Sequence, residues 1–339
     1  CNEENSIQAT LHSLLASTGI RLEIIAVDDR STDGTGALME EVAAEAALQD
    51  SPHTLRVIRN RALPPGWLGK PHALHLAAQC AVAPWLLFTD ADLTFAPRAL
   101  ELALRHALAV QADHLVLTPT LIRKGMGEAV MQAMLQAPLA WFVRLWKVAD
   151  PRAKDFIGVG GFSMVRAEAY TRLGGFAGLR MEVIEDMSFG CMVKRAGYRS
   201  SVALGPGLVS IHWIKGVFGI VGNVEKNGFA ACRYSLAMAT AVSMGLATLV
   251  LVPSAAIVLG GWTLPAGLLT YLGIALAMRA NRSLNGISPL AALLYAPAAA
   301  IVWYAFVRSV ALTLARRGVL WRGTRYPLGE LRRNVIRWW

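Results

Sequence analysis

Two aspartates, Asp90 and Asp92, follow an apolar segment and form the clearest chemical feature of the sequence. The segment 85–89 reads Trp-Leu-Leu-Phe-Thr, and a Leu-Thr-Phe-Ala-Pro turn follows the two acids. A buried parallel strand presents its last residues at the sheet edge where open α/β sheets bind ligands. Two carboxylates there suit Mg²⁺ or Mn²⁺, which one or two carboxylates hold together with phosphate oxygens of a substrate. In the alternative interpretation, these aspartates only form a turn and cap the next helix.

Two further acidic pairs follow apolar residues. Asp28 and Asp29 come after the segment 22–27, and Glu185 and Asp186 come after Val-Ile at 183–184. We interpret all three pairs as strand ends of one sheet. Because parallel strands align their carboxyl ends, the three pairs are expected to meet at one crevice. One such pair can arise by chance in an α/β domain, whereas three are much harder to explain that way.

A lysine and a glycine cluster lie between these acidic pairs. Lys70 belongs to the segment 63–71, which is too rich in Pro and Gly for regular structure and is predicted to be a loop. Its charge could face a phosphate, although a solvated loop lysine fits the segment nearly as well. Gly160 and Gly161 belong to a glycine-dense turn at 158–163, where the backbone can approach a ligand closely.

The elements that must position these residues follow an alternating pattern of helices and strands. Such alternation predicts an α/β fold with a mostly parallel sheet and helices on both faces. Apolar residues at helical spacing predict helices at 6–17, 36–47, 72–81, 98–110 and 188–195, and short apolar runs predict strands at 22–27, 55–58, 85–89, 115–118 and 202–204.

The sequence beyond residue 234 has a different composition, and hydrophobic residues make up 55% of the whole chain. The segments 235–261 and 288–315 are apolar and long enough to cross a hydrocarbon core of about 30 Å, and 262–278 is marginal. Arg279 and Arg282 would mark a cytoplasmic loop between the segments 262–278 and 288–315. We therefore predict membrane-embedded segments at 235–315, with an even number of crossings.

Positive charge is concentrated at the end of the chain. From residue 279 onward there are ten Arg, one Glu and no Lys or Asp, which gives +9 of the formal net charge of +10. Beside apolar segments, this basic tail (316–339) is typical of contact with anionic lipid headgroups, and no nucleic-acid-binding motif accompanies it. The four cysteines have no metal-binding or disulfide spacing.

An apolar stripe runs along residues 126–148, with Trp141 and Trp146 close to basic residues. This pattern is typical of a helix that lies in a membrane interface. A helix that faces the protein core and bends at Pro138 explains the stripe about equally well. The sequence alone does not distinguish these two interpretations.

The ordered acidic motifs resemble those of family 2 glycosyltransferases with the GT-A fold. The matching segments are 27–35 (Val-Asp-Asp-Arg-Ser-Thr-Asp-Gly-Thr), Thr89-Asp90-Ala91-Asp92 and Glu185-Asp186. Asn2-Glu3-Glu4 is similar to the turn after the first strand of that family, so we expect a strand upstream of residue 1. Residues 65–70 and 321–326 and the apolar segments resemble the membrane-bound branch, which includes hopanoid-associated, carotenoid-pathway and ceramide glycosyltransferases. The hopanoid-associated type is the most similar.

The resemblance implies roles for the residues that bind the sugar donor. Asp28, Asp29 and Glu3 would hold the nucleoside of a nucleotide-diphosphate sugar, most simply a UDP-sugar. Asp90 would face the ribose or the metal, Asp92 would bind the divalent cation, and Lys70 would add positive charge near the phosphates. Asp33 would brace the loop that contains it.

The resemblance also implies the acceptor side of the site. Asp186 would be the general base of an inverting transfer, with Glu185 assisting it, and Gly160 and Gly161 would lie near the acceptor. After the base, related enzymes carry an Arg-Trp pair, whereas the segment 209–213 reads Val-Ser-Ile-His-Trp. Trp213 could still stack on the acceptor, and His212 is either an acceptor contact or a hydrogen-bonded loop residue.

These features together indicate an inner-membrane enzyme with three parts. A catalytic domain at 1–234 would face the cytoplasm, followed by the membrane-embedded segments and the basic tail. It would transfer a sugar to a hydroxyl group of a membrane lipid. A processive polysaccharide synthase and a catalytically degenerate scaffold that binds sugar nucleotides or lipids are the alternatives. The oligomeric state cannot be predicted from the sequence.

Overall fold

The computed structural model of the chain describes residues 1–49, 51–280 and 287–338, without the side chains of residues 136–142. The chain forms two compact units. The first contains residues 1–120, 143–212 and 333–339, and the second contains residues 121–142 and 213–332. Trp141 and Arg282, which carried part of the sequence argument, lie outside the described side chains and residues.

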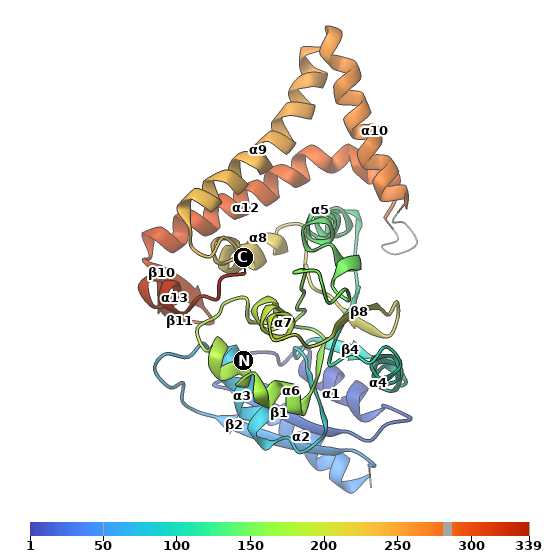
Figure 1. Cartoon of the computed structure of the whole chain (residues 1–339), viewed down its shortest axis with the longest axis vertical. Helices are drawn as coiled ribbons and strands as arrows, with labels where there is room; N and C mark the ends of the chain where they lie inside the picture. The colour runs from blue at the N-terminus through green and yellow to red at the C-terminus, as the bar shows by residue number, and fades with distance from the viewer. Residues whose placement is uncertain (50, 281–286, 339) are drawn as a thin grey trace. The chain divides into compact units, whose positions relative to one another are not determined.

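The first unit alternates helices and strands (Figure 1). Its elements in chain order are α1 (Ile7–Leu15), β1 (Glu23–Asp29), α2 (Thr35–Leu48), β2 (Thr54–Asn60), α3 (Gly69–Cys80), β3 (Trp85–Phe88), β4 (Leu93–Phe95), α4 (Ala99–Ala109), β5 (His114–Thr118), η1 (Leu145–Lys147), β7 (Ser163–Arg166), α6 (Ala167–Arg172), η2 (Gly175–Leu179), α7 (Glu185–Arg195), β8 (Ser200–Leu204) and β9 (Val209–Ile211). The short strand β6 (Thr120–Leu121) ends at the start of the second unit. The predicted α/β class is confirmed.

The strand pairing among the described residues is mixed rather than mostly parallel. Strands β1 and β2 pair in parallel, with Asp29 opposite Asn60, and β5 pairs in parallel with β8. Strand β7 lies between β3 and β5 and is antiparallel to both. The sequence did not predict β7, because this strand has only four residues and follows directly on the glycine-dense turn. Its pairing places Ser163 opposite Phe88, two residues before Asp90.

An aromatic cluster inside the first unit fixes two of the acidic segments. The rings of Phe88 and Phe176 lie 4.9 Å apart edge to face, and those of Phe176 and Phe189 lie 5.4 Å apart and stacked. Such arrangements stabilise a core beyond simple burial. Because Phe88 ends β3 and Phe189 belongs to the first turns of α7, this cluster holds the backbones that carry Asp90 and Asp186.

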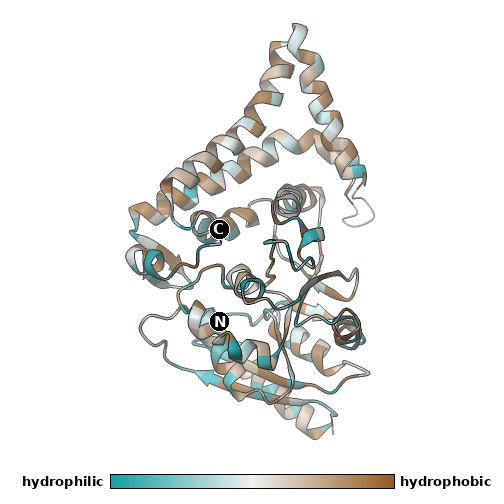
Figure 2. Cartoon of the chain, viewed as in Figure 1, coloured by the Kyte–Doolittle hydropathy of each residue, from teal (hydrophilic) through white to brown (hydrophobic). Residues whose placement is uncertain are grey.

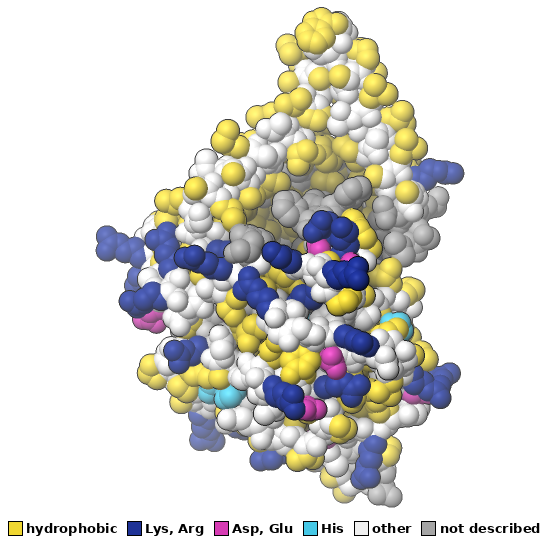
Figure 3. All heavy atoms as spheres, in the orientation of Figure 1, with side chains coloured by type: hydrophobic (Ala, Val, Ile, Leu, Met, Phe, Trp, Pro, Cys, Tyr) yellow, Lys and Arg dark blue, Asp and Glu magenta, His cyan; other side chains and the backbone are white. Residues whose placement is uncertain are grey.

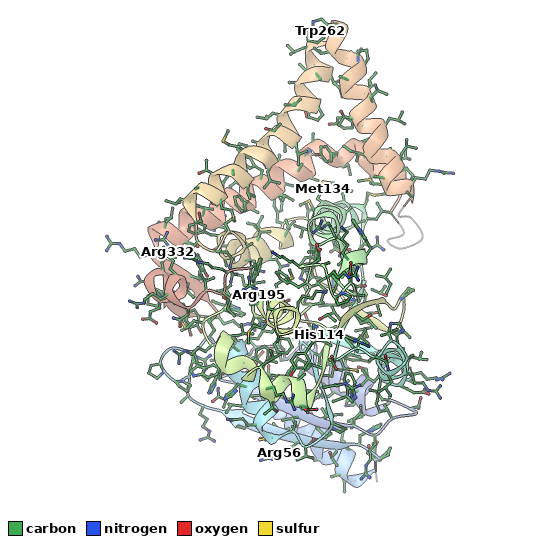
Figure 4. All side chains as sticks on the ribbon, in the orientation of Figure 1. Arg56, His114, Met134, Arg195, Trp262 and Arg332 are labelled. Atoms are coloured by element: carbon green, nitrogen blue, oxygen red, sulfur yellow. The ribbon has the colours of Figure 1, made fainter. Side chains whose placement is uncertain are left out.

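The second unit is mostly helical. Its elements are α5 (Met126–Val143), α8 (Gly219–Ala231), α9 (Leu236–Leu259), η3 (Gly261–Thr263), α10 (Leu264–Ala280), η4 (Pro289–Leu294), α12 (Tyr295–Ala315), β10 (Gly318–Trp321), β11 (Thr324–Pro327) and α13 (Leu328–Asn334), whose last two residues belong to the first unit. Helices α9 and α10 form a hairpin that turns at Gly260 and Gly261, both with positive φ (67° and 55°). Trp262 lies at its tip and is 91% exposed (Figure 4).

Within the described residues, three helical segments are long and apolar enough to cross a membrane: Leu236–Leu259, Gly261–Ala280 and Pro289–Ala315. Apolar residues predominate along all three (Figure 2). Lys and Arg side chains gather over β10, β11 and α13 (Figure 3). The three apolar segments predicted from the sequence are therefore helices, and the marginal second one is long enough to span.

The helix predicted at 126–148 ends earlier than expected. Helix α5 ends at Val143, and Arg144 adopts a positive φ of 44° before the short 3-10 turn η1. A non-glycine residue in this conformation breaks a right-handed helix. Trp146, which lies beyond this break, is 65% exposed.

Candidate functional site

The end of strand β1 carries two carboxylates that are hydrogen-bonded or ion-paired to neighbouring groups of the same chain. Asp28 and Asp29 are each only 6% exposed. Asp29 accepts a bidentate pair of hydrogen bonds from the Arg30 guanidinium at 3.0 and 2.9 Å and one from Asn60 Nδ2 at 2.7 Å. Asp28 accepts the Ser31 amide at 3.3 Å and faces Arg59 at 3.6 Å. A buried carboxylate is tolerated only with such partners, so these bonds fix the shape of the loop after β1.

The first turn of α3 lies against Asp29. A Cβ atom built on Gly69 would lie 2.5 Å from Asp29 Oδ2 and 2.7 Å from Arg30 Nη2. A side chain at position 69 would therefore have to displace the paired side chains of Asp29 and Arg30. Lys70 is the next residue, and it lies in the first turn of α3 rather than in the predicted loop. The helix begins three residues earlier than predicted because Pro71 is compatible with the first turn of a helix.

The loop at 30–35 is closed by contacts with the chain's first residues. Asp33 Oδ1 accepts the Thr35 hydroxyl at 2.6 Å and the Thr35 amide at 3.0 Å, and the hydroxyl bond is the main reason that the pKa of Asp33 is lowered. The Glu3 amide donates to Thr35 Oγ1 at 2.7 Å, and the Glu3 carboxylate accepts the Ser6 hydroxyl at 3.2 Å. The prediction that Asp33 braces this loop is confirmed.

Lys70 brings two of the acidic segments together. Its Nζ lies 2.5 Å from Asp90 Oδ1 and 2.8 Å from Glu185 Oε1. Glu185 is 4% exposed, whereas the side chains of Lys70 and Asp90 are 26% and 34% exposed. Burial lowers the pKa of Lys70, but the charges of Asp90, Glu185 and Asp186 outweigh this effect and raise it well above its usual value. The ammonium is therefore charged at any physiological pH.

Asp186 completes this cluster and contacts the glycine-dense turn. Its Oδ2 accepts the Gly160 amide at 2.9 Å, and its Oδ1 accepts the Met187 amide at 2.7 Å. A Cβ on Gly160 would lie 2.8 Å from Lys70 Nζ, 3.1 Å from Asp90 Oδ2 and 3.5 Å from Asp186 Oδ2. The carboxylates of Asp90 and Asp186 and the ammonium of Lys70 therefore surround Gly160.

The environment of Asp186 makes its carboxylate a stronger base than an ordinary aspartate. Burial and the neighbouring charge of Glu185 raise its pKa to about 6, against the opposing effects of Lys70 and the Met187 amide. A carboxyl group whose pKa lies near neutrality can accept a proton during a reaction at physiological pH.

The position of Glu185 and Asp186 corrects the sequence interpretation. They do not end a strand of the sheet, because they form the first turn of α7. In addition, β1 and β3 belong to separate hydrogen-bonded sheets among the described strands. Asp90 and Glu185 come together because Lys70 on α3 contacts both of them. Asp28 and Asp29 are bound by other partners and do not join this cluster. A helix N-terminus favours negative charge, so α7 also suits these two acids.

The remaining predicted site residues lie in different surroundings. Asp92 is partly exposed two residues beyond Asp90. Gly161 is buried, and a Cβ built on it would lie 3.0 Å from Leu93 Cδ2. Its carbonyl accepts the Thr89 hydroxyl at 2.9 Å. His212 ends the first unit, and Trp213 begins the second. Trp213 is 37% exposed, and its carbonyl accepts Asn223 Nδ2 at 3.3 Å.

Sequence reasoning missed residues that support this cluster from behind. Glu182 and Ser188 are 1% and 0% exposed on either side of the acidic pair, and Trp338 donates its indole N–H to Ser188 Oγ at 3.0 Å. The sequence assigned Trp338 only to the basic tail. The tryptophans at the end of an arginine-rich segment were the only available signal.

The donor atoms available for a metal are limited in number. Among the residues that the structure describes, no group of three or more His, Cys, Asp and Glu side chains is arranged to hold a metal ion. Asp90 and Asp92 offer hard oxygen donors, and Mg²⁺ often takes only one or two carboxylates and fills its shell with phosphate oxygens and water. The donor set therefore fits a divalent cation that binds together with a diphosphate.

Comparison with known proteins relates the chain to one family. The sequence model described as "Glycosyl transferase family 2" matches residues 1–186. No curated protein matches significantly.

Among solved structures, Staphylococcus aureus TarS is similar with a TM-score of 0.43 and 16% identity over 66% of this chain, which spans 37% of that chain. TarS 1-349 in complex with UDP gives a TM-score of 0.40 and 15% identity, covering 96% of this chain and 93% of that one. TarS 1-349 in complex with UDP-GlcNAc gives a TM-score of 0.39 and 14% identity, covering 95% of this chain and 92% of that one.

Proposed function

Because the chain belongs to glycosyl transferase family 2, we propose that it transfers a sugar from a nucleotide-diphosphate sugar to a hydroxyl group of a membrane lipid. The observation that carries this proposal is the cluster around Lys70, which joins Asp90, Glu185 and Asp186. It combines a fixed positive charge with a carboxylate of raised pKa. Transfer from a diphosphate needs both a positive charge near the leaving group and a base near the acceptor.

The donor is assigned to the side of the cluster formed by β1, α3 and the residues after β3. Asp28, Asp29 and Glu3 shape the nucleoside end, and Asp90 and Lys70 lie toward the ribose and diphosphate. A UDP-sugar is the simplest donor, and UDP and UDP-GlcNAc are the ligands of the TarS structures. Asp92 and Asp90 would hold Mg²⁺ or Mn²⁺, which would neutralise negative charge on the departing diphosphate.

Asp186 is proposed as the general base. It removes the proton of the acceptor hydroxyl while that oxygen attacks the anomeric carbon and the bond from that carbon to the diphosphate breaks. A single displacement of this kind inverts the configuration at the anomeric carbon. Glu185 is hydrogen-bonded to Lys70 and orients the ammonium rather than taking the proton, because it is almost completely buried.

A lipid acceptor is supported by the three apolar helices within the same chain. Within the first unit, we assign Gly160, Gly161 and His212 to the acceptor side. Hopanoid-, carotenoid- and ceramide-like lipids all offer a hydroxyl at a membrane surface. The proposed location is the inner membrane, with the first unit in the cytoplasm, where nucleotide sugars are made.

The experiment is to incubate membranes that contain the protein with labelled UDP-sugars and to analyse the lipid extract. A labelled lipid that appears with the wild type and not with Asp186→Asn supports the proposal. Label that enters a polymer indicates a processive synthase instead. Binding of UDP by calorimetry, with and without Mn²⁺, but no turnover would identify a degenerate scaffold.

A further inference from the structure

The last residues of the chain pack against the helix that carries the proposed base. We call residues 335–338 the C-terminal strap, and they belong to the first unit. The Ile336 amide donates to Glu182 Oε1, and Trp338 Nε1 donates to Ser188 Oγ at 3.0 Å. The Ser188 hydroxyl in turn donates to Glu182 Oε2 at 3.0 Å. The strap, Glu182 and Ser188 therefore form one closed hydrogen-bond network.

This network is buried and polar, so its members depend on one another. Glu182 and Ser188 are 1% and 0% exposed. A buried carboxylate that loses a hydrogen-bond donor is strongly destabilised, whereas a fully satisfied network is rigid. Ile336 also packs against the aromatic cluster that contains Phe189 of α7. The strap thus fixes the first turns of α7 through both polar and apolar contacts.

Trp338 also contacts the segment on the other side of Asp186. Its ring lies edge to face on Phe156, with ring centroids 5.9 Å apart. Phe156 leads into the glycine-dense turn, and this turn packs directly on α7. A Cβ on Gly158 would lie 1.8 Å from the Asp186 carbonyl oxygen, and one on Gly190 would lie 2.0 Å from the Ile157 carbonyl oxygen.

We propose that Trp338 is a positioning residue for the base, because a single side chain holds both segments that bind the Asp186 carboxylate. One segment is the first turn of α7, which Trp338 reaches through Ser188. The other is the turn that donates the Gly160 amide to Asp186, which Trp338 reaches through Phe156. The inference rests on the proposed role of Asp186. The chain end thereby acts on catalysis without touching the substrate.

The test compares Trp338→Phe, Ser188→Ala and the double variant in the full-length protein. Trp338→Phe keeps a ring on Phe156 and removes the indole donor, and Trp338→Ala removes both. We expect kcat for transfer to fall about tenfold in Trp338→Phe and about 100-fold in Trp338→Ala, with KM for the UDP-sugar unchanged, because small displacements of a catalytic group are costly. The matched control is Arg337→Ala, an exposed neighbour whose change should leave kcat unaltered.

The double variant distinguishes positioning from general loss of stability. If Trp338 acts through Ser188, the double variant loses no more kcat than the more affected single variant. Additive losses, an equal loss in Arg337→Ala, or a rise in KM without a fall in kcat would overturn the proposal.

Hydrogen exchange provides a readout that does not depend on transfer. Trp338→Ala should speed exchange of the amides at 157–160 and 187–188 while leaving those of β1 and α3 unchanged. Unchanged exchange at 157–160 and 187–188 overturns the strap proposal even if the enzyme is active. A wild type that binds UDP but transfers no sugar to lipid overturns the proposed function instead.

Discussion

At the scale of single residues, the site depends on one ammonium that lies among three carboxylates. Lys70 contacts Asp90 and Glu185 directly, and its charge opposes the rise in the pKa of Asp186. Carboxylates placed this close raise one another's pKa, and a neighbouring cation opposes this effect. The pKa of Asp186 is therefore set by burial and the charge of Glu185, which raise it, against the charge of Lys70, which lowers it.

This balance predicts the effect of Lys70→Met. Without the ammonium, Asp90 and Glu185 would no longer be neutralised, and the pKa of Asp186 should rise further above about 6. The acid limb of the pH profile of kcat/KM should then move to higher pH, in addition to a general loss of rate. A pH profile measured from about 5 to 9 on both proteins tests this. An acid limb that stays in place would show that Lys70 does not control the base.

A second prediction concerns the effects of Asp186→Asn on both sugar transfer and stability. Because the pKa of Asp186 in the folded protein, about 6, lies above its ordinary value of 3.8, the folded protein binds more protons than the unfolded chain between those two values. Stability therefore falls as pH rises through this window. Removing the charge should abolish most transfer, preserve UDP binding, and leave the protein at least as stable at pH 8. Thermal unfolding and calorimetry measure these effects. A variant that transfers normally contradicts the assignment.

Gly160→Ala tests the closeness of the cluster. The added methyl group would lie 2.8 Å from Lys70 Nζ and 3.1 Å from Asp90 Oδ2, both at the ends of side chains that can move. We expect a well-folded protein with a kcat reduced about 10- to 100-fold, because the charged groups are displaced. Gly222→Ala in α8 is the matched control, since nothing lies within 4 Å of its Cβ position. Equal activity of the two variants would contradict this geometry.

At the scale of elements, the approach of the 157–160 turn to α7 is a contact between backbones. Neither Gly158 nor Gly190 has space for a Cβ, since the facing atoms are carbonyl oxygens at 1.8 and 2.0 Å from the built positions. Backbone atoms cannot rotate away as side-chain ends can. The contact therefore fixes the position of the helix as well as that of the carboxylate.

Gly158→Ala should accordingly cost more stability than Gly160→Ala. Overpacking in a close-packed interior costs about 1–3 kcal/mol, and a clash with backbone belongs at or above the upper end. We expect a clearly lower midpoint of thermal unfolding for Gly158→Ala and little change for Gly160→Ala. Parallel denaturation curves provide the comparison. The opposite order would mean that the turn does not pack on α7 in solution.

At the scale of the whole molecule, the membrane topology is restricted because residues from before and after the apolar helices belong to the same compact unit. Residues 333–338 pack within the same unit as residues 1–120. Both ends of the described chain must therefore lie on one side of any membrane, so an even number of crossings is expected. Two of the three apolar segments would cross, and the third would lie within the membrane or its interface.

A reporter fused after the last residue tests this topology. If the first unit is cytoplasmic, this reporter should lie in the cytoplasm. A reporter inserted after Gly261, at the tip of the α9–α10 hairpin, should face outward. Activity of both fusions in a transfer assay would show that they retain the native fold. An outward-facing chain end in an active fusion would contradict the topology.

Several features follow from the sequence alone. The α/β class, the three apolar helices and the acids after β1 and β3 are all readable, because strand and helix periodicity and the span of a bilayer are local properties of the chain. Polar residues that follow an apolar strand lie at a sheet edge whatever the rest of the fold does. Asp28, Asp29 and Asp90 were found for this reason.

The tertiary structure decided which of these residues meet. The sequence placed Lys70 in a loop, Glu185 and Asp186 at a strand end and Trp338 in a basic tail. In the structure the first two features are helix first turns, and Trp338 packs behind the second of them. A helix boundary and the contact between Trp338 and Ser188, which lie 150 positions apart, both depend on packing between distant segments. No local sequence pattern encodes such packing.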